Sequence, residues 1–274
     1  MPELPDLQII GEYLNPRLAG VVVTAARVRR PIPVRNLLGD NLATHLVGRR
    51  FTGVSRRGKF LLLGLEDSVW LAINPMLAGR IRYGQPLKRD RTRDALVIDL
   101  AGGNELRYND AVDMGKVYLT RDLAQVPGFA SLGPDALDPG LTLDAFLLRI
   151  RRYTGEIKSV LANQDFVAGI GNAYADEICW QAGVYPFRRR STLQPAELTQ
   201  VYQAMRVVLL QAIEKLRARM GDAIDEEIRD FLAVHGKAGQ PCPKCGNAIS
   251  AVTRDWCAIH FCRACQTGLM VDRG

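Results

Sequence analysis

A chain of 274 residues is long enough for one large domain or two medium ones, each with its own hydrophobic core, and we expect two. The 36 lysines and arginines outnumber the 29 acidic residues, and the net charge of +7 favours a polyanionic partner, with nucleic acid as the leading candidate. The longest apolar runs fall well short of the roughly 20 residues of a membrane span, and no apolar leader precedes them. We therefore expect a soluble cytoplasmic protein, associated with the nucleoid if it is bacterial.

The first six residues, Met-Pro-Glu-Leu-Pro-Asp, contain a candidate nucleophile. Removal of Met1 would expose the amine of Pro2, and a typical α-amino pKa of about 7.7–8.0 leaves such a group partly neutral near pH 7. A neutral amine attacks the carbon of a sugar or aldehyde and gives an iminium, which acts as an electron sink. Glu3 lies beside it as a candidate acid. An ordinary start to a helix or strand is the alternative interpretation of the same residues.

The first half of the chain changes from a helical to a β pattern. Apolar residues recur at helical spacing over residues 7–19, where Pro16 interrupts the pattern near its end. From residue 20 to about 120, short β-branched runs alternate with turn residues, which indicates a sandwich or a barrel. The Gly-Gly-Asn sequence at 102–104 predicts a hairpin, because glycine tolerates the positive φ of tight turns.

A basic segment, Arg56-Arg57-Gly58-Lys59, precedes the apolar run FLLLGL. Three cations at the entrance of a strand could reach a phosphate backbone. A solvated basic turn explains the same residues, and the segment alone does not decide between the two.

The second half of the chain is predicted to be helical. A stretch rich in proline and glycine, residues 121–142, marks the domain boundary. Beyond it, capping and periodicity predict helices over 142–152, 156–163, 172–183 and 195–219. The loop 163–172 joins two of them through two glycines and ends at Asn172, which could cap the next helix or bind a phosphate at its N-terminus.

Four of the six cysteines form two Cys-x-x-Cys pairs near the C-terminus. The pairs are separated by sixteen residues, which is the spacing of a Cys₄ zinc ribbon. Four thiolates would leave Zn²⁺ no vacant position, so we expect one structural zinc ion per chain. The predicted ligands are Cys242, Cys245, Cys262 and Cys265.

Together these features resemble the family of formamidopyrimidine-DNA glycosylases and endonuclease VIII, which are bifunctional DNA glycosylases with AP-lyase activity. The resemblance spans essentially the whole chain. It rests on MPELPD, RRGKFLLL, LRYND, IKSVLANQDFVAGIGNAYADEI, RDFL, GKAGQPCPKCG and CRACQ, which occur in family order.

The resemblance implies an α+β multidomain fold and a monomer that acts on damaged DNA. An N-terminal catalytic β-sandwich with flanking helices would occupy residues 1–125, and a linker would occupy 126–141. A helix-two-turn-helix domain would follow over 142–235, and a zinc finger with a β-hairpin over 236–270.

The resemblance also implies roles for individual residues. Pro2 would attack C1′ of the damaged nucleotide, Glu3 would act as an acid on the sugar, and Lys59 would contact phosphate and assist proton transfer. Extrusion of the nucleotide requires side chains that fill the gap in the stack. The intercalating positions would be Leu77, Val112 and Met114. The DNA-contacting residues would be Asn172, Lys158, Arg152, Arg93 and Arg254.

Three departures from the family pattern concern the damaged strand. The arginine that usually bonds the orphaned base is replaced by Val112, and Asp113 beside it would repel phosphate unless it is screened or turned away. The arginine usually found five residues before the third zinc ligand is replaced by Cys257, so a charge-assisted phosphate contact is lost, for which Arg254 could partly substitute. The segment between RDFL and the first cysteine pair is shorter than usual, which leaves the lesion preference open.

Two functions follow from these observations. The first is base excision with strand nicking by β- or β,δ-elimination, because the candidate nucleophile, acid and zinc ligands are retained. The second is a non-catalytic or weakly catalytic DNA-binding paralogue that recognises abasic, gapped or bent DNA, because residues that distort the duplex have changed.

Overall fold

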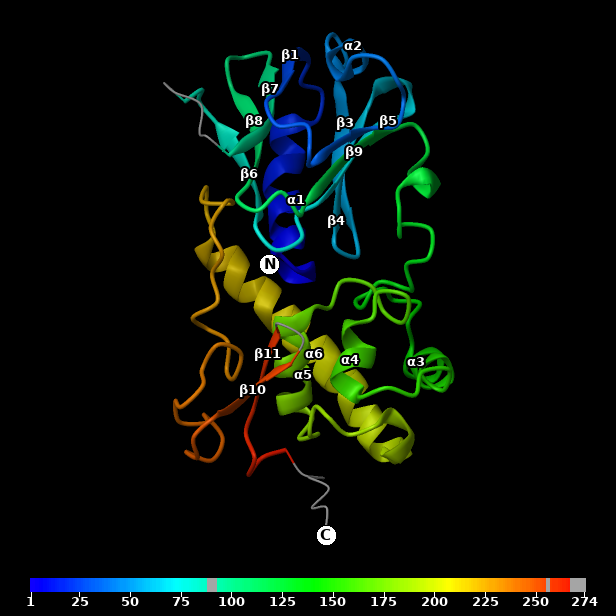
Figure 1. Ribbon diagram of the computed structural model, residues 1–274, viewed down its shortest axis with the longest axis vertical. Coiled ribbons are helices and arrows are strands. Elements are labelled where there is room, and N and C mark those ends of the chain that lie inside the picture. The colour runs from blue at the N-terminus through cyan, green and yellow to red at the C-terminus, as the bar shows by residue number, and fades with distance from the viewer. Residues whose placement is uncertain (88–92, 255–256, 267–274) are drawn as a thin grey trace. The chain divides into compact units, whose positions relative to one another are not determined.

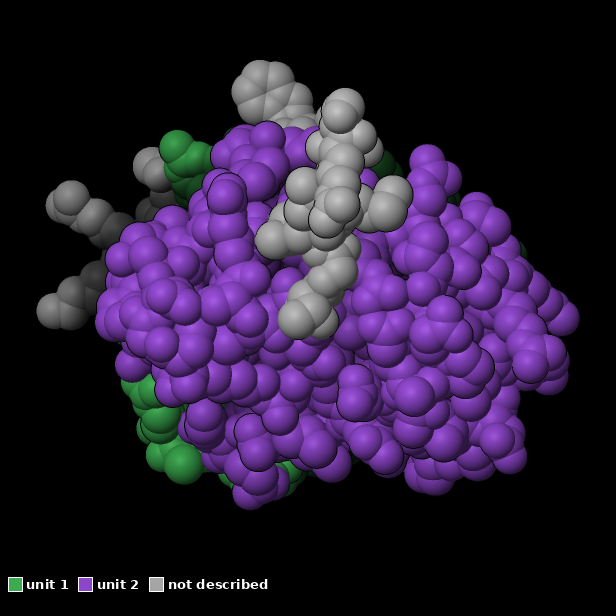
Figure 2. Space-filling model, turned by 90° about the horizontal axis from the view of Figure 1, so that it is seen from below, with its two compact units in different colours: residues 1–131, 216–228 green, residues 132–215, 229–274 purple. Residues whose placement is uncertain are grey.

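The computed structural model describes residues 1–87, 93–254 and 257–266 of the chain. These residues form two compact units, which are coloured separately in Figure 2. Unit 1 comprises residues 1–131 together with 216–228, and unit 2 comprises 132–215 and the residues from 229 onward. The chain therefore passes from one unit to the other three times.

Unit 1 begins with helix α1 (Leu4–Leu18), whose apolar side chains at helical spacing are fully buried. Glu3 caps this helix in a capping box with Asp6, and Pro5 lies in the first turn, so α1 begins three residues earlier than the apolar pattern predicts. The predicted interruption at Pro16 is wrong, because α1 continues through it. A proline inside a helix removes one backbone hydrogen bond and crowds the carbonyl four residues earlier, and burial of the flanking Leu14 and Leu18 favours the helix despite that cost.

The strands of unit 1 form two β-sheets (Figure 1). The four-stranded sheet is antiparallel throughout, with the order β1-β7-β8-β6, and the five-stranded sheet has the order β2-β9-β5-β4-β3, in which only β2 and β9 are parallel. The strands are β1 (Val23–Val28), β2 (Val34–Asn36), β3 (Phe51–Arg57), β4 (Phe60–Leu65), β5 (Val69–Asn74), β6 (Gly79–Gly84), β7 (Asp94–Leu100), β8 (Glu105–Asp110) and β9 (Lys116–Thr120). Short helical segments of the unit are α2 (Leu42–Leu46), η1 (Glu66–Ser68) and η2 (Leu123–Gln125).

The sequence of β4 explains its place in unit 1. All six residues of this strand are buried, and α1 packs against β3 and β4. A continuous apolar run such as FLLLGL is typical of a strand covered on both faces. The predicted hairpin at 102–104 connects β7 to β8, and both of its glycines have positive φ.

Unit 2 contains the predicted helices and a two-stranded hairpin (Figure 1). The helices are α3 (Leu143–Ile150), α4 (Ile157–Ala162), α5 (Asn172–Gln181), η3 (Arg190–Thr192) and α6 (Pro195–Arg219), whose last residues belong to unit 1. Thr142 caps α3 as expected, whereas α5 begins at Asn172 with Gly171 as its cap. The hairpin pairs β10 (Ser250–Arg254) with β11 (Cys257–Phe261). The α+β fold class is thus confirmed.

Among the described helices, none combines the length and the apolar character that a membrane crossing requires.

Candidate functional site

The N-terminal residues of unit 1 are held as firmly as core residues. Pro2 and Glu3 are both buried, and Glu3 is only 1% exposed. The backbone N–H of Glu3 donates to Asp6 Oδ2 at 2.8 Å, and the Glu3 carboxylate accepts from the backbone of Asp6 in return. The candidate nucleophile and the candidate acid are therefore fixed at the start of a buried helix.

The ammonium group of Met1 binds a carboxylate from a distant part of unit 1. It donates to both oxygens of Glu227, at 2.8 and 3.0 Å, and the guanidinium of Arg80 pairs with the same carboxylate. A cavity of about 10 Å³ beside these groups is lined by Pro2, Arg80, Ile224 and Glu227, among others. With Met1 in place, this cavity has room for one water molecule and not for a nucleobase.

Lys59 lies in the tight turn between β3 and β4. Gly58 has a φ of +57°, a conformation that favours glycine, and its carbonyl accepts a hydrogen bond from Arg56 at 3.0 Å. Burial lowers the pKa of Lys59, and the negative charge of Glu3 opposes that shift. The turn therefore brings the Lys59 ammonium into the electrostatic field of the predicted acid.

The three predicted intercalating residues are exposed apolar side chains on two loops of unit 1. Leu77 and Val112 are each 52% exposed, and Met114 is 45% exposed. Gly79 and Gly115 end the two loops, and a Cβ atom on either would collide with the Tyr108 hydroxyl and the Pro75 carbonyl oxygen. The close approach that these glycines permit brings the two loops together.

In unit 2, the loop between α4 and α5 is held by a side chain that sequence analysis did not single out. The amide of Gln164 donates to the carbonyls of Ala162 and Ile170, at 2.8 and 2.7 Å, and accepts from Gly169 N–H at 2.9 Å. Asn172 donates from Nδ2 to the carbonyl of Ala258 on β11, at 3.1 Å. Asn172 thus ties the start of α5 to the hairpin.

Asp176 on α5 is a buried carboxylate that bonds to three residues from other parts of unit 2. Lys158 Nζ lies 2.6 Å from Asp176 Oδ1, and His235 Nδ1 lies 2.8 Å from Oδ2. The backbone N–H of His260 donates to the same Oδ2 at 3.1 Å. Burial raises the pKa of Asp176, but hydrogen bonds from His235 and His260 and the charge of Lys158 outweigh it and hold the pKa below its usual value.

Lys158, which was predicted to contact DNA, lies in this buried cluster. Its side chain is 7% exposed, and it serves as the internal counterion of Asp176. Contact between Lys158 and a phosphate stays a prediction. The other predicted DNA-contacting cations are more accessible: Arg93 and Arg152 are exposed, and Arg254 is 56% exposed while its guanidinium pairs with Glu156 at 2.7 Å.

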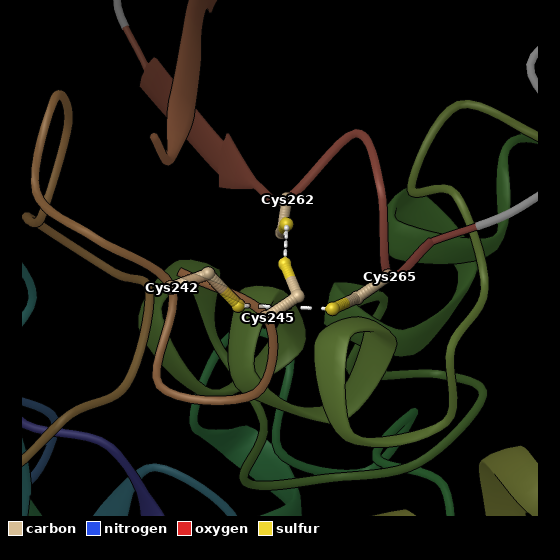
Figure 3. Close-up of side chains that lie close together, drawn as sticks. All are labelled: Cys242, Cys245, Cys262 and Cys265. Atoms are coloured by element: carbon tan, nitrogen blue, oxygen red, sulfur yellow. Dashed lines mark hydrogen bonds between the residues drawn. The ribbon is translucent and has the colours of Figure 1, made fainter. Parts of the chain in front are cut away.

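The four predicted metal ligands converge in unit 2 (Figure 3). Their sulfur atoms all lie within 4.8 Å of one another, with Cys242 Sγ 3.7 Å from Cys265 Sγ and Cys245 Sγ 3.5 Å from Cys262 Sγ. Tetrahedral zinc with bonds of about 2.3 Å requires sulfur–sulfur separations of about 3.8 Å. The cluster therefore has the size of a Cys₄ metal site and could bind a metal ion.

The surroundings of the sulfur atoms favour metal binding. Burial raises the pKa of Cys242, but hydrogen bonds from the Trp180 indole, at 3.3 Å, and from the backbone of Lys244 and Cys245 lower it to about 6. Burial and the neighbouring sulfur atoms raise the pKa of Cys265. Four thiolates at these distances repel one another, and a bound cation removes that repulsion.

Most of the predicted site residues gather at a few places within their own unit. Pro2, Glu3 and Lys59 lie together in unit 1, and the four cysteines lie together in unit 2. Sequence analysis did not single out four side chains that bond to the predicted site or to the backbone beside it. Asp110 accepts from the backbone of Val112, Gln164 bonds to the loop before Asn172, Asp176 pairs with Lys158, and Glu227 binds the Met1 ammonium. The partners of Asp176 and Glu227 lie far along the chain, so no local sequence pattern predicts these contacts. The partners of Asp110 and Gln164 are local backbone groups, and no sequence motif that we used predicts such bonds.

Comparison with known proteins matches parts of both units to domains of one family. Residues 1–117 match the model of the formamidopyrimidine-DNA glycosylase N-terminal domain, and residues 132–222 match the model of the formamidopyrimidine-DNA glycosylase H2TH domain. The formamidopyrimidine-DNA glycosylase of Pelotomaculum thermopropionicum is 30% identical over 273 residues, which cover 97% of this chain and 99% of that protein. The enzyme of the same name from Moorella thermoacetica is 35% identical, with 92% and 94% covered.

Solved structures agree with these relatives. A crystal structure of Lactococcus lactis Fpg with DNA containing an abasic site matches with a TM-score of 0.87 and 27% identity, over 97% of this chain and all of that one. A variant of the same Lactococcus protein bound to DNA containing Fapy-dG also matches with a TM-score of 0.87 and 27% identity.

We expect Asp176→Asn to lower the free energy of unfolding of unit 2 by about 3–5 kcal/mol, because it leaves the Lys158 ammonium buried without its counterion. Urea unfolding followed by circular dichroism at pH 7 measures the change. Asp144→Asn is a matched control, since Asp144 is exposed on α3 in the same unit, and it should cost less than about 1 kcal/mol. Equal unfolding midpoints for the two variants would contradict the role given to Asp176.

Proposed function

Because this chain belongs to the formamidopyrimidine-DNA glycosylase family, we propose that it is a base-excision DNA glycosylase, with AP-lyase activity, that acts on DNA carrying damaged, oxidised bases. One observation carries the proposal: Pro2 and Glu3 are fixed at the start of α1, next to a lysine whose pKa responds to the charge of Glu3. The DNA complexes of the Lactococcus protein support the choice of substrate class.

The proposed reaction begins once Met1 has been removed. The neutral secondary amine of Pro2 attacks C1′ of the damaged nucleotide, so that an N–C1′ bond forms while the bond from C1′ to the base breaks and the base leaves with the electron pair. The departing base takes up the proton that the Pro2 nitrogen loses, which restores the nitrogen lone pair for the ring-opening step. Glu3 then donates a proton to the ring oxygen O4′ as the C1′–O4′ bond opens. The product is an iminium that links Pro2 to the opened sugar.

Strand cleavage follows from the same intermediate. The iminium makes the protons on C2′ acidic, and loss of one of them expels the phosphate at C3′ by β-elimination. Water then hydrolyses the iminium and restores the amine. Lys59 is suited to assist proton transfer, because burial lowers its pKa below the ordinary value for a lysine.

DNA binding is proposed to use cations from both units. Arg93, Arg152 and Arg254 are accessible, and Asn172 lies at the first turn of α5, where backbone N–H groups favour a phosphate. Lys158 is proposed to support that position from its buried place beside Asp176. Zn²⁺ is proposed as the ion held by the four cysteines, with the structural role of fixing β10 and β11.

Borohydride trapping tests the nucleophile. Protein whose intact mass shows that Met1 is absent should form a covalent adduct with a duplex containing an abasic site. Glu3→Gln should still be trapped on that abasic duplex but should excise damaged bases more slowly by a factor of about 100 or more, since it lacks the acid.

The outcomes separate the two functions considered from the sequence. A wild-type protein that binds the abasic duplex yet gives no adduct would defeat the enzymatic proposal in favour of a DNA-binding paralogue. Full lyase activity in Pro2→Gly would defeat the assignment of the nucleophile alone.

Loss of one cysteine ligand should release the metal. Cys245→Ser is expected to reduce the zinc content, measured by plasma emission spectrometry, from one ion per chain to nearly none, and to weaken binding to the abasic duplex. Cys179→Ser is the control, because Cys179 is buried away from the cluster and should leave the zinc content unchanged. Unaltered zinc in Cys245→Ser would exclude the proposed site.

We expect excision to depend little on the base opposite the lesion. Val112 has no hydrogen-bonding side chain with which to read the orphaned base, whereas a good bidentate contact discriminates by about 1–3 kcal/mol. Single-turnover rates with each of the four opposite bases should therefore differ by less than about fivefold. A preference of a hundredfold for one base would show that another residue reads that position.

A further inference from the structure

The loop Asp110–Gly115 presents an acidic side chain between two apolar ones. Val112 and Met114 are about half exposed, and the side chain of Asp113 between them is 18% exposed. Apolar side chains that enter a base stack act as wedges, and a carboxylate among them would be repelled by the phosphates on either side. The loop can work as a wedge only if its shape is fixed and this charge is compensated.

The carboxylate of Asp110 fixes the loop from inside. Asp110 is fully buried, and its two oxygens accept hydrogen bonds from the backbone N–H groups of Val112 at 3.0 Å, Asp113 at 3.1 Å and Gly115 at 2.6 Å. These three bonds hold the backbone of the loop around one carboxylate. Asp113 has a φ of +58°, a conformation that aspartate tolerates better than most residues.

Arg30 binds the outside of the same loop. Its guanidinium pairs with the Asp113 carboxylate and also donates to the backbone carbonyl of Asp110 at 3.3 Å. Arg30 is itself anchored, since its backbone N–H donates to Ala95 on β7 at 3.3 Å. One side chain, 80 or more residues away along the sequence, therefore joins the beginning of the loop to its acidic residue.

We propose that Arg30 is a positioning residue for the intercalating loop: it neutralises Asp113 and holds it aside, so that Val112 and Met114 can enter the base stack. This inference rests on the proposed function, because the stack in question is that of the damaged duplex. The pairing explains how an aspartate can stand in a loop that enters DNA, because Arg30 neutralises the carboxylate that would repel phosphates.

The test compares Arg30→Met with a matched control. Arg27→Met removes a second Arg–Asp ion pair, the one between Arg27 and Asp99, from strand β1 of the same unit. Both variants lose one positive charge and one Arg–Asp ion pair, but only the Arg30 pair includes a residue of the loop. Thermal unfolding followed by circular dichroism establishes that both are folded before any rate is compared.

Two substrates distinguish a misplaced loop from a general loss of activity in the variant protein. The first is a duplex with one abasic site and 2-aminopurine opposite it, whose fluorescence reports unstacking, and the second is the same abasic strand without its complement. We expect Arg30→Met to slow trapping on the duplex by about tenfold and to reduce the fluorescence change, because the wedge is misplaced. Trapping on the single strand, which has no stack to open, should stay within about twofold of wild type.

A double variant tests the charge. In Arg30→Met, Asp113 Oδ2 has lost its cation, so adding Asp113→Asn should remove the repulsion and recover part of the duplex rate. Equal duplex rates for Arg30→Met and Arg27→Met, an equal loss on the single strand, or a double variant as slow as Arg30→Met would each overturn the proposal. Wild-type protein that is trapped on neither substrate would overturn the proposed function instead.

Discussion

The chemistry proposed for this protein depends on one constraint: residue 2 of the chain must be held in a fixed position. Chain termini are ordinarily the least ordered part of a domain. Here the capping box between Glu3 and Asp6, together with the buried side chains of Leu4 and Leu7, fixes the terminus to the core of unit 1. Capping interactions contribute about 1 kcal/mol each, and burial of two leucines contributes about 1.5–3 kcal/mol apiece. A group that reacts as an amine is thereby positioned like a core residue.

Buried carboxylates position the other functional segments. Asp110 holds the intercalating loop through three backbone N–H groups, and Asp176 brings α4, α5 and the hairpin together. Glu177 accepts hydrogen bonds from the backbone of Ala233, Val234 and His235, each at 2.8 Å. A buried carboxylate is stable only when its oxygens are bonded, so each of these side chains fixes the backbone that surrounds it.

Much of the fold could be predicted from the sequence because the decisive signals are local. Cysteine spacing identified a cluster whose sulfur atoms converge, apolar runs and glycines identified strands and a hairpin, and Thr142 marked the start of α3. The beginning of α1 was missed although its signal was present, since Glu3, Pro5 and Asp6 together form a capping pattern. Contacts such as those of Arg30 with Asp113 and of Asp176 with His260 join residues 83 and 84 positions apart, and no local pattern encodes such pairs.

The division of the chain affects the order in which it can fold on the ribosome. Unit 1 includes residues 216–228, and within it Arg217 pairs with Glu12 at 2.9 Å while Glu227 pairs with Arg80. Arg217 and Glu227 are translated only after residues 132–215. Synthesis at about 5–20 residues per second therefore delays their appearance by roughly 5–20 s. During that interval the nascent sheets of unit 1 lack their last segment, so completion of the first unit must await most of the second.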